Sequence, residues 1–233
     1  MQNIKEDKQI YLSGGGNEKQ SFPLDKFFFN ELPKNGSFLY IPIALRGHSL
    51  YLTAHLWMEN ILKLHDRTDL HFKIVDDLLA YKFEELKTFD GVYIGGGNTW
   101  SLMQELKNSG FSNSLIQYIH TKVSSQVYGG SAGAIILGKR IDTHYDPNKP
   151  PLIDVSGLNF LHNYSVACHF KNEQSERFKK WSTDNNLPII CLSEETGLIV
   201  KNNVALCVGT KPCKIYFASG AESDINSGES FNL

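Results

Sequence analysis

The chain has 233 residues, of which 41% are hydrophobic and 21% charged, and its formal net charge is −2. This composition is typical of a folded globular protein, and the balanced charge gives no indication of a basic surface for nucleic acid or an anionic membrane. No apolar run reaches the ~18 residues that span a bilayer, and the polar first residues lack the apolar core of a signal peptide. We therefore expect a cytoplasmic protein that binds neither nucleic acid nor membrane.

Strand-like and helix-like segments alternate in the first part of the chain. Short β-branched and aromatic runs predict the strands, and apolar residues spaced near 3.6 predict the helices. In chain order we predict strands at 9–13, 37–45, 70–75, 90–94 and 125–130 and helices at 48–67, 83–87, 99–110 and 114–122. Such alternation indicates an α/β fold with a mainly parallel sheet and helices on both faces.

The chain after Gly138 has a different character. A turn-rich stretch, "THYDPNKPP", precedes a strand-like segment at 163–170, and short strand-like runs joined by turns such as "KNN" follow Pro188. Hairpin turns between short strands indicate antiparallel pairing. We predict that these C-terminal strands close the edge of the same sheet, and that residues 1–233 form a single domain because no linker or repeat divides them.

Glycine-rich turns follow three of the predicted strands, after Ser13, Ile94 and Tyr128. Because the carboxyl ends of strands form the ligand cleft of open α/β sheets, we expect these turns to converge. A nucleotide site fits them poorly. "GGGNTW" has Trp100 where the dinucleotide fingerprint requires its last glycine, and neither "GGGNEK" nor "GGSAGA" has the G-K-[ST] ending of a P-loop.

The four cysteines form no C-x-x-C pair, which favours reduced, packed thiols over disulfides or zinc. Cys168 stands next to His169, a pairing that occurs in cysteine nucleophiles. Neighbouring residues on a strand point to opposite faces, so we expect these two side chains to diverge. We expect no metal and no organic cofactor.

The stretch "QVYGGSAGAIIL" contains the pattern G-x-S-x-G, from Gly129 to Gly133, between a predicted strand and an apolar helix. In this context the pattern is typical of a nucleophile elbow, a strained turn that small neighbours make possible. Ser131 is then the candidate nucleophile, and the backbone N–H of Ala132 points to where an oxyanion would form. A structural turn is the alternative interpretation.

A serine nucleophile needs a base and an acid that orients the base. His162 and His169 flank the strand-like segment 163–170, and His169 is better placed at its polar end. The orienting acid could be Asp146, in the loop after the nucleophile helix, or Glu194, which ends a predicted strand. We favour Glu194 slightly, because the end of a strand is positioned more firmly than a proline-rich loop.

The segments "YIGGGNTWSLMQEL", "YGGSAGAIILG", "CHFKNEQSER" and "CLSEETGL" resemble, in order and spacing, peptidase family S51, which includes dipeptidase E and cyanophycinase relatives. The resemblance implies a serine hydrolase on a flavodoxin-like sheet related to class I glutamine amidotransferases. It implies Ser131 as nucleophile and His169 as base, with the acid on Asp146 or Glu194. It places the second oxyanion donor on Gly97.

The resemblance also implies that Asn98 and Arg177 bind substrate, with Arg177 gripping an N-terminal aspartate. Gly130 departs from the aspartyl dipeptidase pattern, which has tryptophan there, and the segment from His169 to Arg177 is shorter than in that pattern. We therefore expect a serine peptidase for small peptides, with an N-terminal aspartate preference as the finer hypothesis. The alternatives are an amidotransferase-like protein and a non-catalytic ligand-binding member. Amidotransferases of this type use cysteine at the elbow, whereas this chain has Ser131, which favours hydrolysis.

Overall fold

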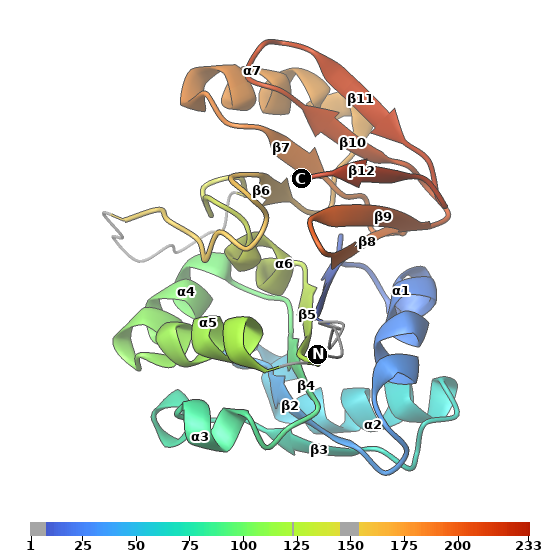
Figure 1. Cartoon of the computed structure of the whole chain (residues 1–233), viewed down its shortest axis with the longest axis vertical. Helices are drawn as coiled ribbons and strands as arrows, with labels where there is room; N and C mark the ends of the chain where they lie inside the picture. The colour runs from blue at the N-terminus through green and yellow to red at the C-terminus, as the bar shows by residue number, and fades with distance from the viewer. Residues whose placement is uncertain (1–7, 123, 145–153) are drawn as a thin grey trace, which may run out of the picture.

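The computed structural model describes residues 8–122, 124–144 and 154–233 (Figure 1). Strands and helices alternate as far as residue 137, and strands predominate after it. The strands are β1 (Gln9–Ser13), β2 (Ser37–Ile41), β3 (His71–Ile74), β4 (Gly91–Ile94), β5 (Gln126–Gly130), β6 (Ser165–Ala167), β7 (Ile189–Cys191), β8 (Thr196–Lys201), β9 (Val204–Gly209), β10 (Cys213–Tyr216), β11 (Glu222–Ile225) and β12 (Ser230–Asn232). The α-helices are α1 (Glu18–Glu31), α2 (Ala54–Leu64), α3 (Phe83–Leu86), α4 (Thr99–Asn108), α5 (Phe111–Thr121), α6 (Ala132–Leu137) and α7 (Ser175–Asn185).

The larger sheet has eight strands in the order β12-β9-β8-β1-β5-β4-β2-β3. The five strands from β1 to β3 in this order are parallel, whereas β8, β9 and β12 continue the sheet in antiparallel pairing. Strands β3-β2-β4-β5 follow the order of flavodoxin-type sheets, and the N-terminal strand β1 occupies the fifth position. The predicted α/β fold with a mainly parallel sheet and antiparallel C-terminal strands is confirmed.

Helices cover both faces of this sheet, and the alternation of side chains along each strand decides which helix a residue meets (Figure 1). On β2, Leu39 and Ile41 belong to the core that contains residues of α4 and α5. The intervening Phe38 and Tyr40 belong to the aromatic core that contains residues of α1 and α2. The face of the sheet covered by α1 and α2 is therefore rich in aromatic rings, and some of these rings also line the functional site.

Four strands form a second sheet, in the order β11-β10-β7-β6. The sequence prediction that the C-terminal strands all close the edge of one sheet is therefore wrong for β7 and β10. The reason is the helix α7, which connects β6 to β7 and makes this pair parallel, as a crossover connection requires. The carboxyl ends of β6 and β7 consequently lie side by side, just before His169 and Glu194.

The helix α1 is absent from the sequence prediction, because Pro23 lies inside it and proline usually breaks a helix. Its start is well defined. The Asn17 side chain accepts hydrogen bonds from the backbone N–H groups of Lys19 and Gln20, and the Gln20 side chain accepts one from the Asn17 N–H. This capping box fixes the Gln20 side chain at the carboxyl end of β1.

The helix predicted for 48–67 divides into two parts. It begins as a 3-10 helix, η2 (Ser49–Thr53), and continues as α2. A shorter 3-10 helix, η1 (Ile43–Leu45), precedes it directly after β2. These short turns after β2 bring apolar side chains to the carboxyl edge of the sheet, next to the candidate site.

Candidate active site

The turn between β5 and α6 holds Ser131 in an unusual backbone conformation, with φ 49° and ψ −107°. A non-glycine residue at positive φ is strained, and such strain is concentrated at functional sites. The neighbours must be glycine: a Cβ on Gly129 would lie 2.5 Å from the Gly133 carbonyl oxygen, and one on Gly133 would lie 2.3 Å from the Ile94 carbonyl oxygen. The predicted strand-elbow-helix geometry is therefore present.

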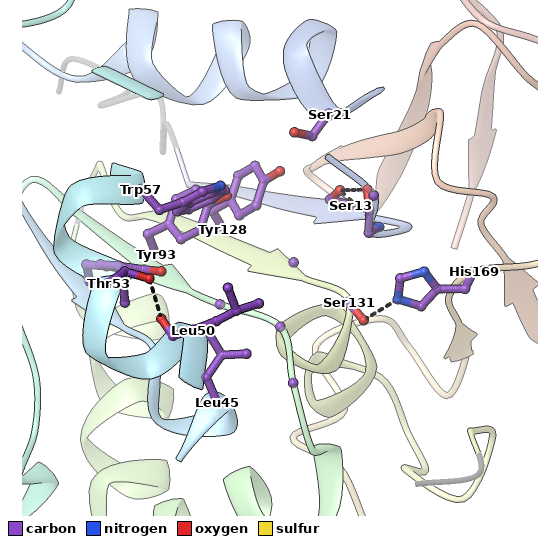
Figure 2. A pocket seen from close by; sticks show the side chains of 18 residues that line it. Ser13, Ser21, Leu45, Leu50, Thr53, Trp57, Tyr93, Tyr128, Ser131 and His169 are labelled. Carbon is purple, nitrogen blue, oxygen red and sulfur yellow. Dashed lines mark hydrogen bonds between the residues drawn. The ribbon is translucent and has the colours of Figure 1, made fainter. Parts of the chain in front are cut away.

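Three side chains form a continuous hydrogen-bonded row at this turn. The Ser131 Oγ lies 2.8 Å from the His169 Nε2, and the His169 Nδ1 lies 2.9 Å from the Glu194 Oε1 (Figure 2 shows the first contact). A carboxylate can only accept, so the His169 Nδ1 carries hydrogen and the Nε2 of the neutral ring can accept from serine. This is the geometry in which an imidazole can take the hydroxyl proton.

Glu194 is held from both sides of its carboxylate. Its second oxygen, Oε2, accepts a hydrogen bond of 3.1 Å from the Gln20 Nε2. The hydrogen bond with His169 is the main cause that holds the pKa of Glu194 below its usual value, and the Gln20 amide acts in the same direction. The carboxylate therefore stays ionised beside the imidazole, as an orienting acid must.

The glycine turn after β1 packs directly on this pair. A Cβ on Gly15 would lie 2.3 Å from the His169 Cε1, and a Cβ on Gly16 would lie 2.9 Å from the Glu194 Cβ. The Gly14 carbonyl also accepts a hydrogen bond of 2.9 Å from the His169 backbone N–H. Three successive glycines are needed here because the backbone takes the space of side chains.

The glycine turn after β4 lies on the other flank of Ser131. A Cβ on Gly96 would lie 3.1 Å from the Ser131 Cβ, whereas Gly97, with φ 134°, packs against the Ala44 carbonyl. Both glycines line the pocket beside Ser131. The assignment of the oxyanion donors to Gly97 and Ala132 stays a prediction, and Gly96 is the glycine of this turn closer to the serine side chain.

A pocket of about 440 Å³ opens from Ser131 toward the aromatic face of the sheet (Figure 2). Its walls are mainly apolar and aromatic. They include Tyr40, Leu45, Leu50, Ala54, Trp57, Tyr93 and Tyr128, together with the glycines and small polar residues near the elbow. This volume lies within the range of small-molecule sites.

A buried carboxyl group lies behind the pocket wall. The Asp25 side chain accepts a hydrogen bond of 2.7 Å from Ser21, which lines the pocket. Burial raises the pKa of Asp25 to about 7. The Nε2 of His65 lies 4.0 Å from the Asp25 Oδ2. Burial lowers the pKa of His65 to about 4, so this histidine is neutral near pH 7. The region behind the pocket is therefore shielded from bulk solvent.

Three other predicted residues have different positions. Asp146 lies outside the described residues. The Asn98 side chain caps α4 by accepting a hydrogen bond of 2.9 Å from the Ser101 N–H. Arg177 donates a hydrogen bond of 3.1 Å to the Thr143 carbonyl. Neither Asn98 nor Arg177 is among the residues that line the pocket, and substrate binding by them stays a prediction.

Gln20 and the aromatic wall were not predicted from the sequence, whereas the turn Gly14–Gly16 was expected at the cleft but not its packing on His169 and Glu194. The capping pattern "NEKQ" after the first glycine turn was a usable signal for the position of Gln20. His144 was also missed; the centre of its ring lies 6.1 Å from that of His169. All four cysteines are free and buried, and the Cys168 thiol donates toward the Ser131 carbonyl rather than to the site.

The sequence profile of peptidase family S51 matches residues 10–208 of the chain. The chain belongs to this family. Its sequence is similar to a probable alpha-aspartyl dipeptidase of Drosophila melanogaster, with 23% identity over 201 residues that cover 80% of this chain and 78% of the relative. It is also similar to peptidase E of Shewanella sp. (strain W3-18-1), with 28% identity over 62% of this chain and 64% of the relative. The match with the Shewanella relative spans slightly less than two thirds of that protein.

Two solved structures of proteins described as peptidases share the fold. A peptidase from an acI-B1 Actinobacterium superposes with a TM-score of 0.65 at 21% identity and covers 98% of both chains. A putative peptidase E protein from Listeria monocytogenes EGD-e gives a TM-score of 0.63 at 20% identity, over 87% of this chain and 98% of the other. At these identities the comparison establishes the fold and not the substrate.

The described residues lack both a metal-binding cluster and a membrane-spanning helix. They contain no group of three histidine, cysteine, aspartate or glutamate side chains that could hold a metal ion. Nor does any helix among them have the length and apolarity needed to cross a bilayer.

Proposed function

We propose that this S51 family member is a serine peptidase that hydrolyses small peptides through Ser131, His169 and Glu194. The observation that carries the proposal is the row of two hydrogen bonds that joins these side chains, 2.8 and 2.9 Å long, with the serine at a strained elbow. Family membership independently favours peptide hydrolysis. Asp146, the other candidate acid, lies outside the described residues.

The reaction begins when the Ser131 Oγ attacks the scissile carbonyl and its proton passes to the His169 Nε2. The oxyanion of the tetrahedral intermediate then accepts hydrogen bonds from the N–H of Ala132 and from the turn that contains Gly97. The intermediate collapses, the bond to the amine breaks, and His169 gives its proton to that amine. Water, activated by the same imidazole, hydrolyses the acyl-serine and restores the enzyme. Glu194 holds the imidazole tautomer throughout and stabilises the imidazolium.

The finer hypothesis, a preference for N-terminal aspartate, is supported by the name of the Drosophila relative and needs a cation at the substrate side chain. Arg177 is the residue that would supply it. In the structure its guanidinium binds the Thr143 carbonyl, and the Phe178 ring lies 5.0 Å away. This contact uses one nitrogen of the guanidinium, so the preference requires the remaining N–H groups to reach the substrate carboxylate.

A serine-directed fluorophosphonate probe tests the proposed function. We expect the intact wild-type protein to gain one adduct, mapped to Ser131 by peptide mass spectrometry, and to lose dipeptide hydrolysis in parallel. Ser131→Ala should give no adduct and at least a roughly 10⁴-fold lower kcat, with an unchanged circular dichroism spectrum. Hydrolysis by the folded alanine variant at near wild-type rate would refute the assignment of the nucleophile.

A further inference from the structure

We propose that the pocket beside Ser131 binds an aromatic side chain of the residue whose carbonyl is attacked, so that the enzyme prefers an aromatic residue over an acidic one on the acyl side. This inference rests on the proposed function and specifies its substrate class. It departs from the aspartyl specificity that the relatives' names suggest.

The pocket walls present several aromatic rings. The rings of Tyr93 and Tyr128 stack with their centres 4.1 Å apart, and Trp57 meets Tyr93 edge to face with the ring centres 6.1 Å apart. Leu45 and Leu50 complete the wall near the elbow (Figure 2). A substrate ring entering here gains both apolar burial and edge or face contacts with these rings.

The pocket walls also carry no counter-charge for an acidic side chain in the described part of the chain. Within the described part of the chain, no lysine, arginine, aspartate or glutamate lines the pocket. Arg46 follows Leu45 directly, but its guanidinium is bound by the Glu105 carboxylate and the Asp76 carbonyl. An aspartate side chain in the pocket would lose its hydration without gaining a cation, and burying an unpaired charge is costly.

The position of the pocket relative to His169 decides which substrate residue enters it. In Figure 2, His169 lies on one side of Ser131, and Trp57, Tyr93 and Tyr128 lie on the other. The leaving amine must receive its proton from the His169 Nε2, so it occupies the histidine side of the scissile bond. The acyl residue then extends toward the aromatic wall, which makes its side chain the one that the pocket selects.

The decisive experiment compares dipeptides that differ only in the acyl residue: Phe-Ala, Leu-Ala, Ala-Ala, Lys-Ala and Asp-Ala. We expect kcat/KM for Phe-Ala to exceed that for Ala-Ala by roughly tenfold or more. The values of kcat/KM for Asp-Ala and Lys-Ala should be lower than that for Ala-Ala. If Asp-Ala is the best substrate of the series, the inference is overturned while the proposed function stands. If no peptide is cleaved and Ser131 is not labelled by the fluorophosphonate, the proposed function itself fails.

Two substitutions locate the preference in the pocket. Trp57→Ala should reduce kcat/KM for Phe-Ala by about tenfold, mainly through KM, and so lower the ratio of kcat/KM for Phe-Ala to that for Ala-Ala. Leu50→Arg should raise kcat/KM for Asp-Ala relative to Phe-Ala by about tenfold, because it brings a cation to the pocket wall. Leu50 is 55% exposed, so this variant should fold even if Trp57→Ala does not.

Leu52→Arg is the matched control for the charge substitution. Leu52 lies two residues further along the same 3-10 helix, is 78% exposed and does not line the pocket. Leu52→Arg should leave the ratio of kcat/KM for Asp-Ala to kcat/KM for Phe-Ala unchanged. If this ratio changes equally in both arginine variants, the effect is a general one of charge. If it changes in neither, the acyl side chain binds elsewhere. Each result contradicts the inference.

Discussion

The two sides of Ser131 differ in composition and in how they are built. On one side, His169, Glu194 and Gln20 form a polar row whose histidine and glutamate side chains are 36% and 41% exposed. On the other, Tyr93 and Tyr128 are almost completely buried and form the wall of an apolar pocket. The polar side is assembled from the loops that follow β6 and β7 and from the first turn of α1, whereas the apolar side is a face of the main sheet covered by α1 and α2.

This difference separates two tasks that meet at one hydroxyl. Proton transfer needs ionisable groups that keep contact with water and with each other, and loops at strand ends supply them. Selection of an apolar side chain needs a rigid, dry surface, which the packed sheet supplies. Substitutions on the polar side should therefore change kcat, and those on the apolar side should change KM or stability.

The largest expected effect is the loss of the base. His169→Ala should lower kcat by roughly 10⁴–10⁶-fold without unfolding the protein, because it removes the acceptor for the serine proton. Steady-state hydrolysis of Phe-Ala measures this. His162→Ala is the control, since His162 contacts Asn203 at the exposed surface and should leave kcat unchanged. Comparable losses in both variants would show that the row at Ser131 is not the proton-transfer path.

Glu194→Gln tests the orienting acid and should lower kcat by about 10²–10⁴-fold, because an amide does not stabilise the imidazolium and can select the wrong tautomer. Glu195→Gln provides a matched control, because Glu195 pairs with Lys211 and is the next residue in the chain. Asp146→Asn should be nearly silent. A larger kcat loss for Asp146→Asn than for Glu194→Gln would transfer the orienting role to Asp146.

Asp25 is buried behind the apolar pocket wall. The free energy of unfolding of Asp25→Asn should therefore differ from that of the wild type by an amount that depends on pH. Burial raises the pKa of Asp25 to about 7 in the folded state, so the folded protein retains a proton that the unfolded chain loses near pH 4. The stability of the wild type therefore falls as the pH rises from about 4 to 7, and asparagine removes this loss. From pH 5 to pH 8, urea unfolding should show the variant gaining on the order of 2 kcal/mol relative to wild type.

Asp69→Asn is the control with the opposite sign. Hydrogen bonds from Arg67 lower the pKa of Asp69 to about 2, so its contribution to stability is complete above pH 4 and is lost only as the pH falls toward 2. The stability difference between this variant and the wild type should therefore be the same at pH 5 and pH 8. A constant difference for Asp25→Asn as well would mean that the region behind the pocket is hydrated.

The smallest expected effect concerns Gln20 as a positioning residue. Gln20→Ala removes the donor to the Glu194 Oε2, so it should raise the pKa of Glu194 toward its usual value and lower kcat by roughly threefold to tenfold with little change in KM. Carboxyl-detected NMR titration and steady-state kinetics measure the two effects. Lys19→Ala, one residue earlier on α1 and exposed, should change neither. A kcat loss without a change in the Glu194 pKa would indicate a purely structural role.

The parts of the fold that follow from local patterning could be predicted from the sequence. The alternation of strands and helices up to Leu137 and the elbow at Ser131 depend on residues that are neighbours in the chain, so periodicity and glycine spacing reveal them. The pair of strands β7 and β10 could not be assigned to their sheet in this way. Strand patterns report burial and not partners, and here the crossover through α7 decided the pairing.

The sequence by itself determined which side chains could do the chemistry: a serine between glycines, a histidine at the end of a predicted strand, and two candidate acids, Glu194 at a strand end and Asp146 in a loop. Tertiary structure placed Glu194 beside His169 and added Gln20, 174 residues away in the chain from Glu194. It also decided that one glycine turn packs on the His169 ring and that aromatic residues from β2, α2, β4 and β5 form one wall. The physical reason is that a strained turn depends on residues adjacent in the chain. The grouping of distant side chains depends instead on which strands pair and which faces they bury.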